Sequence, residues 1–277
     1  MKLLYYLAAI GNDNYKKKQD IFFENIKLLS KNKNIEIDVI INMYHFDQDF
    51  INSIQNNYII NKYYIHNKKG ILVELWKSNP YNKLCKNYDH VLFILDDVLL
   101  KDININEMIK IKNKYFLDII SPRVVNATHK NLMDNFNKNE IIRITNSIEI
   151  YCILMTPKTF LKYIDTHCIN NKWIWGHDLL LKYFGFKTGI YGKNYCEHYF
   201  PQKNSKYFND AKNQMDNFIK KHGFTSFSEI RFKYPPIITR IYQNDIPNYN
   251  KYYILLFFIF VFILFYNYKK IKNFINF

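Results

Sequence analysis

Residues 91–100 read VLFILDDVLL, an apolar stretch that contains two adjacent carboxylates, Asp96 and Asp97. The part from Val91 to Leu95 is typical of a buried β-strand. Ionised carboxylates are costly to bury unless a cation or several hydrogen-bond donors compensate their charge. The pair therefore indicates either a solvated turn at the end of a strand or a ligand site, and the surrounding chain has to decide.

The segments around this stretch alternate between strand and helix patterns. We expect strands at 3–10, 35–43, 58–65, 91–95, 117–125 and 148–155, and helices at 16–30, 70–85, 106–114, 157–166 and 205–222. Such alternation predicts an α/β fold with a Rossmann-like, mostly parallel open sheet flanked by helices, whose ligands bind beyond the carboxyl ends of the strands. Asp96 and Asp97 lie at one such end, so a ligand site is favoured there.

Composition excludes several classes of protein. The chain has 277 residues with seven Gly and seven Pro and no long flexible linker, which favours one main domain. The net charge is +15, but the lysines are spread along the whole chain without a nucleic-acid recognition module, so we expect no nucleic acid as partner. The four cysteines are scattered without a C-x-x-C spacing, which argues against zinc and against a disulfide framework.

The C-terminal part carries a membrane signal. Residues 252–268 read YYILLFFIFVFILFYNY without a charge, and as a helix rising about 1.5 Å per residue they would extend about 25 Å. We predict a transmembrane anchor with a short basic tail over 251–277, preceded by a helical extension and stem over 203–250; a buried core helix is the alternative. A tail anchor favours a cytosolic main domain, whereas the lysines after the span favour the opposite side of the membrane. Glycosylation of Asn126 in the sequon Asn126-Ala127-Thr128 would decide between the two topologies.

The segment 172–202, KWIWGHDLLLKYFGFKTGIYGKNYCEHYFPQ, concentrates aromatic, small and ionisable residues, and we expect a site-bearing loop there. No G-x-G-x-x-G and no G-x-x-x-x-G-K-[ST] follows a predicted strand, which argues against a dinucleotide fold and a P-loop ATPase. The order of an acidic pair after a strand, MTP before a helix, WGHD at 175–178 and His198 resembles the GT-A type of nucleotide-sugar glycosyltransferase. It is most similar to a poorly characterised plant, microbial and giant-virus group with W-D-x-D-like and W-G-x-D motifs. The resemblance covers roughly 3–202 and implies a GT-A-like domain over 1–202.

The resemblance implies a metal site. In such enzymes the acidic motif binds Mn²⁺ or Mg²⁺, which bridges the two phosphates of the donor and stabilises the charge of the leaving diphosphate. Asp96 and Asp97 would be the ligands, with His198 completing the site. The family usually carries a third acidic position, whereas this chain has Leu95 before the pair and Val98 after it.

The resemblance also assigns residues to the two substrates. Asp178 would act as the general base that removes a proton from the acceptor hydroxyl, although the start of a helix at this point is an alternative explanation. Trp175 and Gly176 would shape the acceptor pocket. The nucleotide sugar would lie against residues after the first strand and before the second helix, namely Ala9, Gly11, Asn12, Lys69 and Gly70, although a solvated loop also explains Lys69.

The sequence thus predicts a membrane-anchored, metal-dependent glycosyltransferase that transfers a hexose-like sugar from a nucleotide diphosphate sugar to a hydroxyl of an unknown glycan, lipid or protein. A non-catalytic GT-A-like protein that binds a nucleotide or glycan, or that acts as a membrane scaffold, is the alternative supported by the incomplete acidic motif. A third possibility, a basic peripheral or nucleic-acid-binding protein, requires the positive charge to gather on one face.

Overall fold

A computed structural model describes residues 1–200 and 208–243. The strands are β1 (Lys2–Ile10), β2 (Glu36–Met43), β3 (Ile60–Asn67), β4 (His90–Ile94), β5 (Val98–Asp102), β6 (Ile119–Val125), β7 (Glu140–Thr145), β8 (Cys152–Met155), β9 (Thr188–His198) and β10 (Ile237–Tyr242). The α-helices are α1 (Tyr15–Leu29), α2 (Gln48–Gln55), α3 (Leu72–Ser78), α4 (Ile105–Lys114), α5 (Lys130–Met133), α6 (Pro157–Thr166), α7 (Phe208–Lys221) and α8 (Phe227–Lys233). Two 3₁₀-helices cover η1 (Pro80–Asn87) and η2 (Asp178–Leu180).

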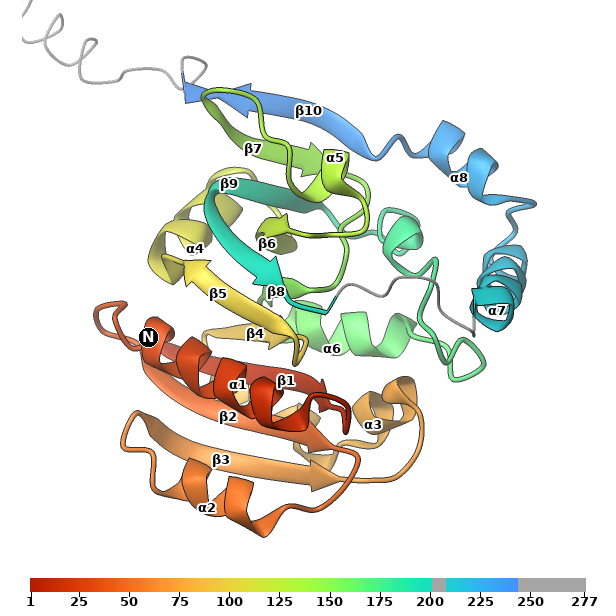
Figure 1. Ribbon diagram of the computed structural model, residues 1–277. Helices are drawn as coiled ribbons and strands as arrows, with labels where there is room; N and C mark the ends of the chain where they lie inside the picture. Colours follow the sequence, from red (N-terminus) through yellow and green to blue (C-terminus); the bar gives the residue numbers. More distant parts are fainter. Residues whose placement is uncertain (201–207, 244–277) are drawn as a thin grey trace, which may run out of the picture. The chain divides into compact units, whose positions relative to one another are not determined.

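The strands form one sheet in the order β10-β7-β9-β6-β8-β4-β1-β2-β3, and β5 pairs with β9 beside this path. Figure 1 shows β3, β2, β1 and β4 as successive neighbours, and these four strands are parallel. Beyond β4 the sheet is mixed, because β8 runs antiparallel to both β4 and β6 and β9 runs parallel to β6. The open α/β sheet expected from the sequence is confirmed, and its parallel half is the predicted βαβ opening.

Helices cover both faces of the parallel half of the sheet. Successive residues of a strand point to opposite faces, so neighbouring residues of β1 pack against different helices. On β1, the ring of Tyr5 packs against Phe22 of α1, with ring centroids 5.6 Å apart. The next residue, Tyr6, points to the other face and packs against Phe160 of α6 at 4.9 Å. The continuous apolar run of β1 is therefore buried on both sides, as a central parallel strand requires.

The sequence expectation for the segment 172–202 was wrong. The segment 172–202 was expected to be a loop, but residues Thr188–His198 form β9, which pairs with β5, β6 and β7. Two residues of this strand, Gly189 and Gly192, lie where neighbouring side chains come close, and a Cβ at Gly192 would collide with the ring of Phe136. Glycine thus allows neighbouring side chains to come close to the backbone of β9, a strand that the sequence alone does not predict.

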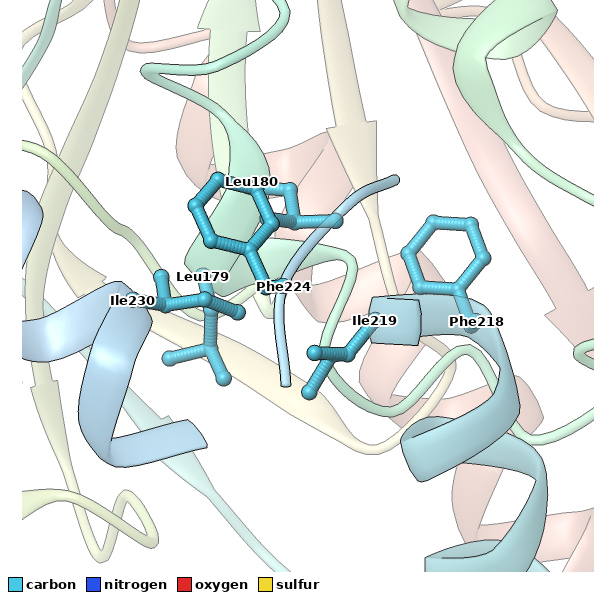
Figure 2. Packing of buried hydrophobic residues seen from close by; sticks show 6 residues of the cluster. All are labelled: Leu179, Leu180, Phe218, Ile219, Phe224 and Ile230. Atoms are coloured by element: carbon cyan, nitrogen blue, oxygen red, sulfur yellow. The ribbon is translucent and has the colours of Figure 1, made fainter. Parts of the chain in front are cut away.

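Residues 1–240 form one compact unit that includes α7 and α8. These helices pack against Leu179 and Leu180, which directly follow the WGHD motif, in a small apolar cluster. Figure 2 shows its six buried members, Leu179, Leu180, Phe218, Ile219, Phe224 and Ile230. Within residues 1–200 and 208–243, no helix has both the length and the apolar character needed to cross a bilayer. The predicted anchor over 251–277 lies outside the described residues.

Candidate functional site

The sheet topology brings the predicted acidic pair to the carboxyl edge of β1 and β4. Asp96 follows β4, and its Oδ2 accepts a hydrogen bond from the backbone N–H of Gly11, just after β1, at 2.8 Å. The ammonium of Lys18, from the first turn of α1, lies 3.1 Å from the same oxygen. Burial raises the pKa of Asp96, and the adjacent Lys18 charge opposes that rise. Asp96 is thus directed toward β1 and α1.

Asp97 is directed the other way, toward β9. Its Oδ2 lies 3.0 Å from Nε2 of His198, the last residue of β9, and the other ring nitrogen of His198 faces the carbonyl oxygen of Asn126 at 3.4 Å. Burial disfavours the protonated imidazole, but the hydrogen bond and charge of Asp97 outweigh burial and raise the pKa of His198. The Oδ1 atom of Asp97 is buried and has no hydrogen-bond partner among the described residues.

A second acidic group lies beside this pair, at the end of β8 that faces the same edge. Nδ1 of His129 lies 2.7 Å from Oε1 of Glu149, whose side chain is 10% exposed. The hydrogen bond to Glu149 is the main reason why the pKa of His129 is raised. Tyr151 connects the Asp97–His198 pair with the His129–Glu149 pair. Its ring packs on His198 with the ring centroids 4.5 Å apart, and its hydroxyl forms a hydrogen bond with Oγ1 of Thr128, the residue before His129, at 2.9 Å.

Asp178, the predicted general base, is the first residue of the 3₁₀-helix η2, and its carboxylate interacts with the backbone N–H groups of Asp178 and Leu179. Burial raises its pKa to about 6, and the negative charge of Glu149 adds to this effect while His129 opposes it. The charge of Glu149 also contributes to the raised pKa of His198. The charge of Glu149 thus acts on both Asp178 and His198, and their predicted convergence with Asp97 on a single cleft stays a prediction.

The other predicted site residues divide into two groups. Gly11 contacts Asp96, and Ala9 is buried in β1 beside it, whereas Asn12 is exposed. Lys69 and Gly70 are exposed beyond the carboxyl end of β3, and two strands, β2 and β1, separate β3 from β4. Among the described residues, no hydrogen bond or ion pair links Lys69 or Gly70 to the acidic pair. The structure thus brings Ala9 and Gly11 next to Asp96, whereas Lys69 and Gly70 lie beyond a different strand.

Trp175 and Gly176 pack against α7. The indole of Trp175 meets the ring of Phe208 with centroids 5.6 Å apart, and its carbonyl oxygen accepts a bond from Asn171. Gly176 has φ +79°, and a Cβ there would stand 2.8 Å from Cγ of Met215. These contacts give both residues a packing role, and their acceptor role stays a prediction.

The side chains do not fit a divalent cation held jointly by the three predicted ligands. Asp96 already accepts bonds from Gly11 and Lys18, and the ring nitrogens of His198 both face oxygen acceptors, so a protonated imidazole offers no lone pair to a metal. In the described part of the chain, no three His, Cys, Asp or Glu side chains are grouped so that they could hold a metal ion. Asp97 keeps a buried oxygen without a hydrogen-bond partner among the described residues, Oδ1, which is a ligand of the kind that Mg²⁺ and Mn²⁺ prefer.

Sequence reasoning missed Lys18, His129, Glu149 and Tyr151. Glu149 carried the same signal as the acidic pair, since it is a carboxylate inside the apolar run SIEIYCILM at 147–155. That run was expected to be a strand from residue 148, but β8 begins only at Cys152, so Glu149 lies in the turn at the site edge. Lys18 belongs to the run Lys16–Lys18, and nothing in the run marks which lysine is buried.

No protein-family model matches this sequence, and no curated protein matches it. Among solved structures, the chain is similar to residues 1–349 of S. aureus TarS in complex with UDP-GlcNAc, at 10% identity and a TM-score of 0.49, over 80% of this chain and 66% of that one. It is also similar to S. aureus TarS at 10% identity and 0.47, over 82% and 44% of the two chains, and to A197 from STIV at 12% and 0.41, over 72% and 86%. The chain thus spans less than two thirds of the TarS chains. At these identities and TM-scores, the similarities assign neither a family nor an activity to it.

Proposed function

We propose that this protein is a GT-A-type glycosyltransferase that moves a sugar from a nucleotide diphosphate sugar to an acceptor hydroxyl. The observation that supports this function is the contact of Asp97 with His198 at the edge of the sheet, together with Glu149, whose negative charge raises the pKa of both His198 and Asp178. Ligands of open α/β sheets bind at this edge. Titratable groups with shifted pKa values beside one another are typical of catalytic sites.

The proposed reaction is a direct displacement at the anomeric carbon. The carboxylate of Asp178 takes the proton of the acceptor hydroxyl while the oxygen attacks, and the electron pair of the breaking glycosidic bond moves onto the diphosphate. A base with a pKa of about 6 is largely deprotonated at neutral pH and still basic enough to accept a proton. Cationic side chains at the edge, Lys18 and protonated His198, would stabilise the diphosphate charge as it develops.

The test is turnover of nucleotide sugars by the full-length chain in detergent, with water or added glycans as acceptor. UDP-GlcNAc, the ligand named for TarS, comes first in a panel of UDP and GDP sugars. Asp178→Asn should lower the rate by about 10²–10⁴-fold, whereas the exposed control Asp49→Asn should retain it. Equal rates for the two variants would remove Asp178 from the mechanism, and the absence of both turnover and nucleotide binding would overturn the proposed function.

A non-catalytic nucleotide-binding protein is the second candidate. The ion pair between Asp96 and Lys18 favours it, because the carboxylate expected to serve the donor is neutralised within the protein. This candidate predicts that the wild-type chain binds UDP or GDP without turning over any sugar of the panel.

We also propose that residues 252–268 anchor the chain in a membrane, on the strength of their uncharged apolar sequence. The full chain expressed in eukaryotic cells should stay in the membrane pellet after extraction at alkaline pH, and a chain ending at residue 251 should not. Asn126 is exposed, so a mass shift lost in Asn126→Gln would place the main domain in the lumen, and an unmodified chain would favour the cytosolic side.

A further inference from the structure

Lys18 is a buried cation at the edge of the sheet. The residue is only 6% exposed, and its Nζ lies 3.1 Å from Oδ2 of Asp96 and 3.6 Å from Oδ1 of the exposed Asp13. Burial of a lysine carries a large desolvation cost unless a partner compensates its charge, and Asp96 is that partner for Lys18. The ammonium and the carboxylate therefore depend on each other.

The backbone at Gly11 passes close to this ion pair. A Cβ at Gly11 would stand 3.0 Å from Nζ of Lys18, which is a tight contact, and 3.6 Å from Oδ2 of Asp96, which is an ordinary one. An ammonium has three N–H donors, and among the described residues only Asp96 and Asp13 contact Nζ. Asp13, at 3.6 Å, lies beyond hydrogen-bond distance, so the ammonium keeps N–H donors for an anionic ligand at the carboxyl edge of β1 and β4.

We propose that the ammonium of Lys18 takes the place of a divalent cation at the acidic pair and supplies the positive charge that binds the diphosphate of the nucleotide sugar. This inference rests on the proposed function for the identity of the ligand. Its geometric basis is independent of that function, because the lysine already neutralises Oδ2 of Asp96, one of the two carboxylate oxygens that could bind a metal. Transfer by this protein would then need no added metal.

The experiment has two parts, both on the full-length chain in detergent. The first follows Mn²⁺ by electron paramagnetic resonance as protein is added, and needs no nucleotide. The second measures UDP and GDP binding by calorimetry in EDTA and in Mn²⁺. Wild type is compared with Lys18→Met, with Lys18→Arg, with the double variant Lys18→Met/Asp96→Asn, and with Lys16→Met, whose lysine side chain is 85% exposed.

The double variant removes both charges together, so it keeps the measurement possible if Lys18→Met alone does not fold with an unpaired buried carboxylate. We expect wild type to leave the Mn²⁺ spectrum unchanged and to bind a nucleotide diphosphate equally well in EDTA and in Mn²⁺. The double variant should bind it at least about tenfold more weakly, the loss expected for one charge-assisted hydrogen bond. Lys18→Arg should keep most of the affinity, and Lys16→Met should keep all of it.

Bound Mn²⁺ in the wild type that disappears in Lys18→Met/Asp96→Asn would overturn the proposal, and so would UDP binding that requires Mn²⁺. If neither nucleotide binds in any condition, the proposed function fails, and with it the role of Lys18 toward a diphosphate. The Mn²⁺ spectra would still decide separately whether the lysine keeps a cation from Asp96.

Discussion

His198 and Asp97 are 101 positions apart in the chain, and Nε2 of the imidazole lies 3.0 Å from Oδ2 of the carboxylate. The antiparallel pairing of β5 with β9 creates this contact, because Val98 stands opposite His198 in the register. The two halves of the candidate site thus meet at the point where the late strand β9 joins the early strands. The predictions below test that arrangement and the packing around it.

The Asp97–His198 contact should make stability depend on pH. The pKa of His198 is raised in the folded protein, so its contribution is complete below the unfolded value of about 6.5 and is lost as pH rises through the folded value. Melting temperatures between pH 5 and 8 should therefore fall less steeply toward high pH in His198→Gln than in wild type. In His66→Gln the change should have the opposite sign, because burial lowers the pKa of His66. Parallel curves for His198→Gln and wild type would contradict the assigned contact.

The base role of Asp178 predicts an acid limb in the pH profile of kcat/KM near pH 6, since the pKa of Asp178 is raised to about 6. Glu149→Gln removes a negative charge that contributes to this shift, so the limb should move to lower pH. The groups titrate together, so the limb belongs to the whole cluster rather than to one residue. A limb that stays in place in Glu149→Gln would show that Glu149 does not act on the base.

Gly176 should be hard to replace. Gly176→Ala combines a left-handed backbone, φ +79°, with a Cβ 2.8 Å from Met215, and we expect a loss of about 2–4 kcal/mol in the free energy of unfolding. Gly223→Ala has a similar φ of +83° but no atom within 4 Å of its Cβ, so it should cost only about 1 kcal/mol. Urea denaturation of the two variants separates backbone strain from overpacking, and equal losses would mean that α7 does not pack tightly on Gly176.

The buried ion pair of Arg143 and Glu140 should be sensitive to removal of one partner. Both side chains are 0% exposed, their Nε–Oε1 distance is 2.6 Å, and Arg143 also donates to the carbonyl oxygens of Asn131, Leu132 and Asn135. Arg143→Met should cost about 3 kcal/mol, the lower end for a broken buried pair, because Arg240 lies 3.8 Å from Glu140 and compensates part of its charge.

The double variant Arg143→Met/Glu140→Leu, measured by the same urea denaturation, should recover part of that loss. Recovery stays incomplete because the three carbonyl oxygens lose their donor. A double variant less stable than Arg143→Met would contradict this account.

Local patterns predicted the parallel half of the fold and the place of the acidic pair. The apolar runs of β1, β2 and β4 and the Thr156-Pro157 start of α6 are local signals, and the side chain of Thr156 does accept a bond from the N–H of Thr159. β9 was missed because Gly189, Gly192 and Asn194 weaken its strand pattern, and only pairing with three other strands stabilises it. The partner of Asp96 was missed for a similar reason, because burial of Lys18 depends on how α1 docks on the sheet.

The position of β9 also sets an order of events for the growing chain. β5, β6 and β7 all leave the ribosome before β9, the strand that each of them pairs with, and so expose unpaired edges while residues up to His198 are still being made. Such non-local pairing slows folding, whereas β1 to β4 pair among themselves early. Nascent chains that stop before residue 188 are consequently the species most exposed to aggregation and most dependent on chaperones.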